Sequence, residues 1–297
     1  DYFTFNEPQC VVGLGDVSGR HAPGLQLPLE YTIPVSYHIH LAHGLAVQRI
    51  RALVPDARVG FVGCGPSPIP ATETPADIEA ARALYFSHPK PEPELWAFSP
   101  SWWLDPVLLG EYPADALSHY GRYMPEGFEK SLALIHRPMD WCAFNYYDGF
   151  LARSNGKGGA ERLPWPAGQP RTAVDWAVTP ELLYWGPRFL WERYRKPVFI
   201  TENGMSVHDA VSLDGKVHDP NRTDFMHRYL LALRRAARDG VDVYGYLAWS
   251  LMDNFEWGNG YRERFGLVYV DYATQRRTPK DSALWYRSVM ETNGGAL

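Results

Sequence analysis

The 297-residue sequence lacks the features that mark several specialised classes of protein. Cys10, Cys64 and Cys142 are far apart, and no pair of them has the spacing of metal ligands. No apolar run approaches the length of a membrane span, and no signal peptide is visible, although the chain begins at Asp1 rather than at Met. We therefore expect no metal, no cofactor and no membrane contact. The odd number of cysteines favours a reducing compartment, and we expect a cytoplasmic protein.

Charge of one sign is not concentrated anywhere in the chain. The net charge is −5, and Lys and Arg are scattered, which argues against a nucleic-acid partner. Repeats and low-complexity linkers are lacking too, so we expect residues 1–297 to form a single domain. Aromatic residues, in contrast, are abundant, with 11 Trp, 18 Tyr and 13 Phe. Much of this content serves a core, but Trp and Tyr also stack on sugar rings while their polar atoms bind hydroxyls.

Strand-like and helix-like segments alternate along the chain. We expect a first strand that ends at Glu7 and further strands over 58–62, 141–147, 198–201 and 243–249. We expect helices, with Pro34 in the first turn of the first one, over 34–53, 75–83, 182–194, 224–239 and 281–291. The segments rich in Pro, Trp and Gly at 89–106 and 156–170 are expected to be loops.

This alternation predicts an α/β fold in which helices cover a parallel sheet. Polar and aromatic residues gather at the ends of the expected strands, namely Glu7, Asn145, Tyr147, Glu202 and Trp249. In a (β/α) barrel all strand C-termini open on one face, where active sites form, so we favour a barrel. A doubly wound sheet is the alternative, but the glycines at 13–19 have neither the spacing nor the following helix of a phosphate-binding loop.

Two glutamates follow short apolar strands in the same way. Glu202 follows 198–201, and Glu7 follows 2–6. A single glutamate in such a place is more often a solvated loop residue or a charge near a helix N-terminus. A carboxylate is costly to desolvate, however, so two at strand ends suggest paired acid chemistry. The neighbouring Asn6 and Asn203 strengthen this interpretation, because an amide can orient a carboxylate or a sugar hydroxyl.

The histidines at 38, 40 and 43 are the other group that could hold a ligand. Only residues three or four apart share a face of a helix, so at most His40 and His43 could act together. We interpret these histidines as packing or helix-surface side chains rather than as a metal site.

Several motifs occur in order along the chain: 6–8 (NEP), 145–147 (NYY), 200–204 (ITENG), 249–257 (WSLMDNFEW), 264–271 (RFGLVYVD) and 277–282 (RTPKDS). The segments 21–24 (HAPG) and 42–44 (AHG) accompany them. Together they resemble glycoside hydrolase family 1, the β-glucosidase family, over essentially the whole chain.

The resemblance implies a retaining β-glycosidase on a TIM (β/α)8 barrel. It implies that Glu7 is the general acid/base after the fourth strand and that Glu202 is the nucleophile after the seventh. Carboxyl groups about 5–5.5 Å apart leave no room for water between them, so a glycosyl-enzyme forms and the configuration is retained. Each negative charge raises the pKa of the other, and glycosylation of Glu202 then frees Glu7 to act as a base.

Other roles are also implied by the resemblance. Asn6 resembles the donor to the sugar 2-hydroxyl, and Tyr147 resembles the phenol that holds Glu202 ionised. Asn145 resembles a residue that lines the same side of the sugar site. The expected substrates are terminal β-glucosyl residues, as in cellulose degradation, with β-fucosyl and β-galactosyl residues as further candidates.

The remaining sugar contacts come from the second half of the chain. Glu256 resembles the acceptor for the 4- and 6-hydroxyls, and Trp257 the partner of the 3-hydroxyl. Trp249 resembles the indole floor under the ring, and Trp176 a platform on the aglycone side. The resemblance also implies that Phe265 is one of the substrate-binding residues.

One departure from the family concerns the start of the barrel. The family's barrel begins well before the NEP motif, but only five residues precede Asn6 here. We therefore expect the chain to cover about the end of the fourth strand to the eighth strand and helix. Residues 2–5 and the last strand would then be apolar edges. Either the chain is a portion of a longer protein, or another chain or copy covers this edge, and we expect it not to be a competent enzyme as a monomer.

Three other functions remain open at this point. The first is a sugar-binding or regulatory half-barrel without turnover, although both glutamates are present. The second is a phospho-glycosidase, against which the charges of Glu256 and Glu263 argue, because they would repel a phosphate. The third is a thioglucosidase, in which Gln replaces the acid, and Glu7 argues against it.

Overall fold

A parallel sheet of five strands forms the centre of the protein. The computed structural model describes residues 1–88 and 96–297. The strands are β1 (Tyr2–Asn6), β2 (Val59–Cys64), β4 (Trp141–Asn145), β7 (Val198–Asn203) and β8 (Val243–Ala248). They are hydrogen-bonded in this order, and every neighbouring pair is parallel. All five C-terminal ends therefore lie at the same edge of the sheet, as expected of an α/β fold.

The two faces of the sheet carry different cores, because alternate side chains of a strand point to opposite faces. One face carries a small aromatic cluster that consists of Val62, Trp141, Ala143 and Phe199, with Tyr244 packed against it. Phe3 joins this cluster, with its ring centroid 4.9 Å from that of Trp141. The alternate residues, which belong to the large core, include Phe61, Cys142, Phe144, Val198 and Ile200.

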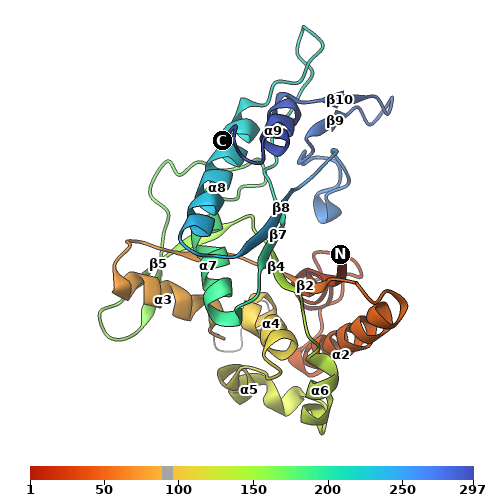
Figure 1. Ribbon diagram of the computed structural model, residues 1–297, viewed down its shortest axis with the longest axis vertical. Coiled ribbons are helices and arrows are strands. Elements are labelled where there is room, and N and C mark those ends of the chain that lie inside the picture. The colour runs from red at the N-terminus through yellow and green to blue at the C-terminus, as the bar shows by residue number, and fades with distance from the viewer. Residues whose placement is uncertain (89–95) are drawn as a thin grey trace.

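Helices cover the face of the large core. The longer helices are α2 (Leu29–Leu53), α3 (Pro75–Phe86), α4 (Pro100–Leu108), α7 (Leu182–Tyr194), α8 (Pro220–Arg238) and α9 (Asp281–Glu291). Helix α4 packs on β2, α7 packs on β7 and on α8, and α9 packs on α8. In Figure 1 the strands β2, β4, β7 and β8 run through the middle of the molecule, with α4 near one end and α8 and α9 near the other.

The sequence of α8 explains why this segment forms a helix. Pro220 occupies the first turn, where its missing N–H costs no hydrogen bond. Arg235 and Arg238 lie in the last turn, where a positive charge is favourable. The buried residues recur every three or four positions, so that one stripe of the helix faces the core: Phe225, Met226, Tyr229, Leu230, Leu233 and Ala236.

Shorter elements complete the structure. A mixed sheet has the order β3 (Ser67–Pro70), β5 (Gly149–Ser154) and β6 (Ala160–Leu163), and a hairpin-like pair joins β9 (Val268–Val270) to β10 (Arg277–Pro279). The short helices are α1 (Pro8–Cys10), α5 (Ala114–Tyr120) and α6 (Leu132–Ile135), and a π-helix spans Val11–Val17. No helix among the described residues is long and apolar enough to cross a membrane.

Three expectations about elements were wrong. Helix α2 begins at Leu29, so Pro34 lies inside it rather than in its first turn. The expected loop 89–106 overlaps α4, whose nine residues are all buried, while 89–95 lie outside the described residues. The expected loop 156–170 contains β6, which pairs with β5. In the last two cases pairing and burial override the Pro and Gly content that suggested a loop.

The two outer strands of the sheet are partly exposed. Among the described residues, β1 pairs only with β2 and β8 pairs only with β7. Large apolar side chains of these strands are in contact with solvent, since Tyr2 is 41% exposed, Phe3 42% and Leu247 46%. The expected apolar edges at both ends of the sheet are therefore present.

Candidate active site

The C-terminal edge of the sheet brings distant polar residues together. Asn6 pairs with Val62 near the end of β2, Cys64 pairs with Asn145, and Asn145 pairs with Glu202. The strand ends are thus level with one another, and Glu7 directly follows β1. The two glutamates that the sequence singled out lie at this same edge although 195 positions separate them in the sequence.

Two asparagines connect the glutamates. Asn145 Nδ2 donates to Glu7 Oε1 at 2.7 Å and to Asn6 Oδ1 at 3.0 Å. Asn6 Nδ2 in turn lies 3.3 Å from Glu202 Oε1, to which it donates. Thr201 Oγ1 donates to Asn145 Oδ1 at 2.5 Å and so fixes the orientation of this amide. Sequence reasoning missed Thr201, which points into the site because Asn145 lies on the neighbouring strand.

An aromatic group lies against Glu202 on its other side. Tyr147 donates its hydroxyl to Glu202 Oε2 at 2.6 Å. The Tyr147 ring lies 5.1 Å from Trp176 and 6.1 Å from Phe265, and Trp176 is also 6.1 Å from Phe265. Phe265 is 3% exposed, so it supports the other two rings from below rather than from the solvent side. These four expected site residues therefore form one continuous group.

The electrostatics of the site favour a proton on Glu202. Burial raises the pKa of Glu202 to about 7, and the negative charge of Glu7 adds to this effect. The hydrogen bonds from Tyr147 and Asn6 act in the opposite direction, because they stabilise the carboxylate. The hydrogen bond from Tyr147 thus lowers the pKa of Glu202, as expected, but burial raises this pKa by more. Burial raises the pKa of Tyr147 itself, which keeps its hydroxyl as a donor.

Glu256 and Trp249 form a second polar group after β8. Burial raises the pKa of Glu256, a hydrogen bond from Trp249 lowers it, and the charges of Glu7 and Glu263 raise it further. The Oε2 atom of Glu256 is buried and has no partner among the described residues, so it is free to accept from a ligand. Glu263 is 2% exposed and pairs with Arg262 at 2.8 Å, which compensates part of its charge.

Trp257 is an exposed member of the expected sugar contacts. Its side chain is 64% exposed, and its ring stacks on His21 with a centroid distance of 5.9 Å. Trp249 instead lines an open cavity of about 600 Å³ with residues of the following loop and of the β9–β10 pair, among them Asp253, Tyr261 and Arg277. Trp249 is the one expected site residue that lines this cavity, and none of the three glutamates Glu7, Glu202 and Glu256 does.

The histidines of α2 pack as the sequence suggested. His40 is buried, and its ring nitrogens lie 2.8 Å from Tyr112 Oη and 3.2 Å from Trp103 O. His43 Nδ1 lies 2.7 Å from Thr4 Oγ1. Burial lowers the pKa of His40 to about 3 and that of His43 to about 4, so both rings are neutral near pH 7.

The cysteines differ from the expectation. Cys10 and Cys64 are 54 positions apart, yet their Sγ atoms are 3.7 Å apart and lie next to Glu7. The spacing argument failed because β1 and β2 are paired, so the end of one strand lies beside the start of α1. The sequence prediction also ended β2 at residue 62, which hid Cys64 at the strand end.

Comparison with known proteins identifies the class. The family description "Glycosyl hydrolase family 1" matches residues 1–295. The chain belongs to this family of glycosidases. Beta-glucosidase A of Thermotoga maritima is 36% identical over 295 residues, which is 99% of this chain and 64% of the relative. A bifunctional beta-D-glucosidase/beta-D-fucosidase of Bifidobacterium breve is 36% identical over 311 residues, covering 96% of this chain and 63% of the relative.

The fold agrees with that of solved members of the family. The Thermotoga maritima family 1 β-glucosidase in complex with isofagomine lactam superimposes with a TM-score of 0.84 at 36% identity. The match covers 99% of this chain and 64% of that chain. The chain thus has the α/β fold of the family's TIM-barrel structures and spans about 64% of the length of these relatives.

Proposed function

We propose that this chain carries the catalytic carboxylate pair of a retaining β-glycosidase, with Glu7 as general acid/base and Glu202 as nucleophile. The observation that carries the proposal is the continuous hydrogen-bond chain from Glu7 through Asn145 and Asn6 to Glu202, with Tyr147 on the far oxygen. Such a chain fixes both carboxylates with neutral donors and leaves their charge free to change during a reaction.

The chemistry follows from the two positions. Glu202 attacks the anomeric carbon in its ionised form, while Glu7 gives its proton to the leaving oxygen. Formation of the glycosyl ester removes the negative charge of Glu202. Glu7, now ionised, takes a proton from water, which attacks the same carbon and releases the sugar with its configuration retained. Since the pKa of Glu202 is about 7, the ionised nucleophile becomes the major form above that pH.

The sugar contacts are assigned by the same argument. Asn6 is exposed at the edge of the sheet and can donate to a 2-hydroxyl while it holds Glu202. The unpartnered Oε2 of Glu256 suits the 4- and 6-hydroxyls. Trp249 supplies an apolar surface for the ring, Trp257 a donor for the 3-hydroxyl, and Trp176 a surface for the aglycone.

The substrate class is a neutral terminal β-glycoside. We propose β-glucosides first, with β-fucosides and β-galactosides as further substrates, because a carboxylate accepts from an equatorial or an axial 4-hydroxyl. The relative from Bifidobacterium breve, which is named a bifunctional glucosidase/fucosidase, supports this breadth. Phosphorylated sugars are rejected, since their charge would face Glu256.

We further propose that residues 1–297 form one catalytic domain in which β1, β2, β4, β7 and β8 are the fourth to eighth strands of the family's barrel. The open edges of β1 and β8 support the view that further polypeptide covers them, from the rest of a longer protein, a second chain or a second copy. A cytoplasmic setting agrees with the three free cysteines.

The test of the roles uses leaving groups of different basicity. Glu7→Ala should slow hydrolysis of alkyl β-glucosides far more than that of activated aryl β-glucosides, because activated leaving groups need little protonation. Azide should restore turnover of the variant and give a β-glycosyl azide. Asp224→Ala, at an exposed carboxylate on α8, is the control and should behave as the parent. In a preparation that hydrolyses β-glucosides, an α-configured product or equal losses on all leaving groups would contradict the proposal.

A further inference from the structure

We propose that Glu7, Cys10 and Cys64 form a binding site for a zinc-like divalent cation beside the carboxylate pair. The cation would be held by one carboxylate oxygen and two sulfur atoms. The binding part of this proposal stands on its own geometry. Its consequence, that the bound cation removes Glu7 from proton transfer, rests on the function proposed above.

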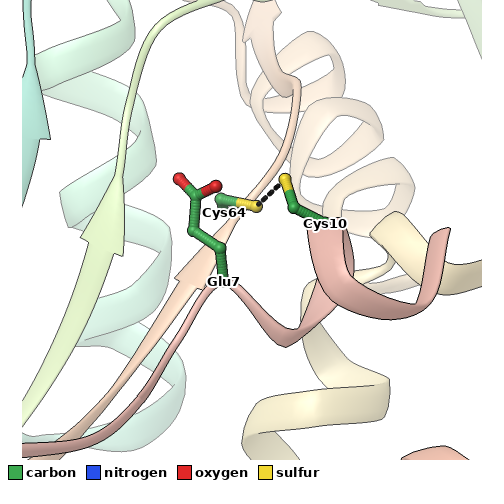
Figure 2. A group of neighbouring side chains, drawn as sticks. All are labelled: Glu7, Cys10 and Cys64. Atoms are coloured by element: carbon green, nitrogen blue, oxygen red, sulfur yellow. Dashed lines mark hydrogen bonds between the residues drawn. The ribbon is translucent and has the colours of Figure 1, made fainter. Parts of the chain in front are cut away.

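The spacing of the ligand atoms fits one small cation. Cys10 Sγ and Cys64 Sγ are 3.7 Å apart. Two thiolates at Zn–S distances of about 2.3 Å in a tetrahedral site lie about 3.8 Å from each other, so the sulfur atoms need hardly move. The three ligand atoms all lie within 4.8 Å of one another. Figure 2 shows the side chains of Cys10 and Cys64 pointing toward each other, with Glu7 next to Cys64.

The backbone holds the three residues in place. Cys64 is the last residue of β2, which pairs with β1, and Glu7 directly follows β1. The Cys10 amide donates to the Glu7 carbonyl at 2.9 Å, so helix α1 fixes Cys10 relative to Glu7. Glu7 itself has a left-handed backbone conformation with φ 48°, which turns the chain sharply from strand to helix. A site formed on such elements is already organised before a cation arrives.

Gln9 provides independent evidence that this site binds a ligand. It is completely buried, and its Nε2 has no hydrogen-bond partner among the described residues. Its Oε1 accepts a hydrogen bond from the Cys64 thiol, with Sγ 3.9 Å away. Half a turn of the amide would direct the N–H donor at that sulfur, which suits a metal-bound thiolate better than a free thiol. A buried amide without a partner is otherwise a cost to the fold.

The ligand types determine which cations bind. Two sulfur ligands favour Zn²⁺, Co²⁺ and Cd²⁺ over Mg²⁺ and Ca²⁺, which prefer oxygen. Each thiol loses its proton to solvent as its sulfur–metal bond forms, and the carboxylate of Glu7 binds in its ionised form. The fourth position is left for water, as in zinc sites with three protein ligands.

A cobalt titration of the 297-residue chain tests binding directly, without any assay of hydrolysis. In a reducing buffer free of chelators, we expect one equivalent of Co²⁺ to produce the ultraviolet thiolate-to-cobalt absorption, and Zn²⁺ but not Mg²⁺ to remove it. Cys10→Ser and Cys64→Ser should each lose this absorption, while Cys142→Ala, which removes the third thiol, should keep it. Circular dichroism shows whether each variant is folded, and the half-exposed Cys10 provides the variant that disturbs packing least.

Several outcomes would overturn the site. They are no absorption in the parent, an absorption that survives both Cys10→Ser and Cys64→Ser, or one that Cys142→Ala abolishes. In a preparation that hydrolyses β-glucosides, Zn²⁺ should inhibit the parent but not Cys10→Ser, and a chelator should reverse the inhibition. Equal losses on all leaving groups in Glu7→Ala would count against the proposed function and leave the cobalt result untouched.

Discussion

Buried charges occur in two regions of this protein, and the two regions neutralise them differently. In the segments that follow β7 and β8, Arg222 Nη2 donates to Asp209 at 2.7 Å, and Lys280 Nζ donates to Asp209 at 2.6 Å and to Asp253 at 2.8 Å. Arg222 also pairs with Asp219, and all five of these side chains are at most 1% exposed. Every carboxylate in this network faces a positive charge.

At the strand ends the carboxylates face neutral donors instead. Asn145 donates to Glu7, while Asn6 and Tyr147 donate to Glu202. The consequence is visible in the pKa of Glu202, which burial and the charge of Glu7 raise to about 7. An ion pair fixes the charge of both partners, whereas neutral donors leave a carboxylate able to gain and lose a proton. The network of ion pairs therefore holds the fold, and the pair at the strand ends is suited to chemistry.

The largest expected effect removes the charge of Glu202. Glu202→Gln should lower turnover of β-glucosides by at least about 10⁴-fold, because an amide cannot attack the anomeric carbon. The fold should remain, and the Tyr147 hydroxyl can still donate to the amide oxygen. Steady-state kinetics with an aryl β-glucoside measures the loss. A decrease of less than about tenfold would contradict the view that the carboxylates at the strand ends, unlike those of the ion-pair network, serve chemistry.

A charge in the network should matter for stability instead. Lys280→Met leaves Asp209 and Asp253 with one cation fewer in a dry site, which should lower the free energy of unfolding by about 3–5 kcal/mol. Lys216→Met, at an exposed lysine, is the control and should change it by less than about 0.5 kcal/mol. Urea denaturation measures both. Equal stability of the two variants would show that the network does not hold the fold.

Removing the Glu202 charge should also stabilise the fold, with a defined pH dependence. The pKa of Glu202 is about 7 in the folded protein against an ordinary value of 4.5, so the folded state holds more protons between these values. Its stability therefore falls as the pH rises from 4.5 to 7, and the full cost is present above pH 7. Between pH 4 and pH 8, the stability of Glu202→Gln relative to the parent should rise by about 3 kcal/mol. A stability difference between Glu202→Gln and the parent that decreases as the pH rises would contradict the raised pKa of Glu202.

The smallest expected effect concerns the hydroxyl at the edge of the pair. Tyr147→Phe removes a donor that stabilises the ionised form of Glu202, so the pKa of Glu202 should rise further. The acid limb of the pH–rate profile should move to higher pH, and turnover at pH 7 should fall about tenfold, or about 1.4 kcal/mol. Tyr244→Phe, on the far part of β8, is the matched control. An unmoved acid limb would mean that Tyr147 only packs against Trp176.

The structure brings together the glutamates and asparagines that the sequence singled out, whereas several of the elements around them differ from the prediction. The bounds of α7 and α9 are correct, because their apolar periodicity is undisturbed. The glutamates and their asparagines were found because each follows an apolar strand. The motif residues after β8 were found by resemblance to the family rather than by pattern.

What sequence reasoning missed depends on pairing between strands. Thr201 and the Cys10–Cys64 pair are defined by neighbours on adjacent strands, which local patterns do not contain. Helix α4 was missed because its prolines suggested a loop, although Pro100 occupies the first turn, where proline is well tolerated. The raised pKa of Glu202 could not be predicted either, since it results from the depth of burial.

The most direct test of the account is to trap the proposed intermediate. A 2-deoxy-2-fluoro-β-glucoside with an activated leaving group should inactivate a preparation that hydrolyses β-glucosides, and peptide mapping by mass spectrometry should place one fluoroglucosyl group on Glu202. The labelled carboxylate would be the one that faces Tyr147 and Asn6 and no cation. A label on Glu7, on Glu256 or on an aspartate of the Arg222–Lys280 network would contradict the account.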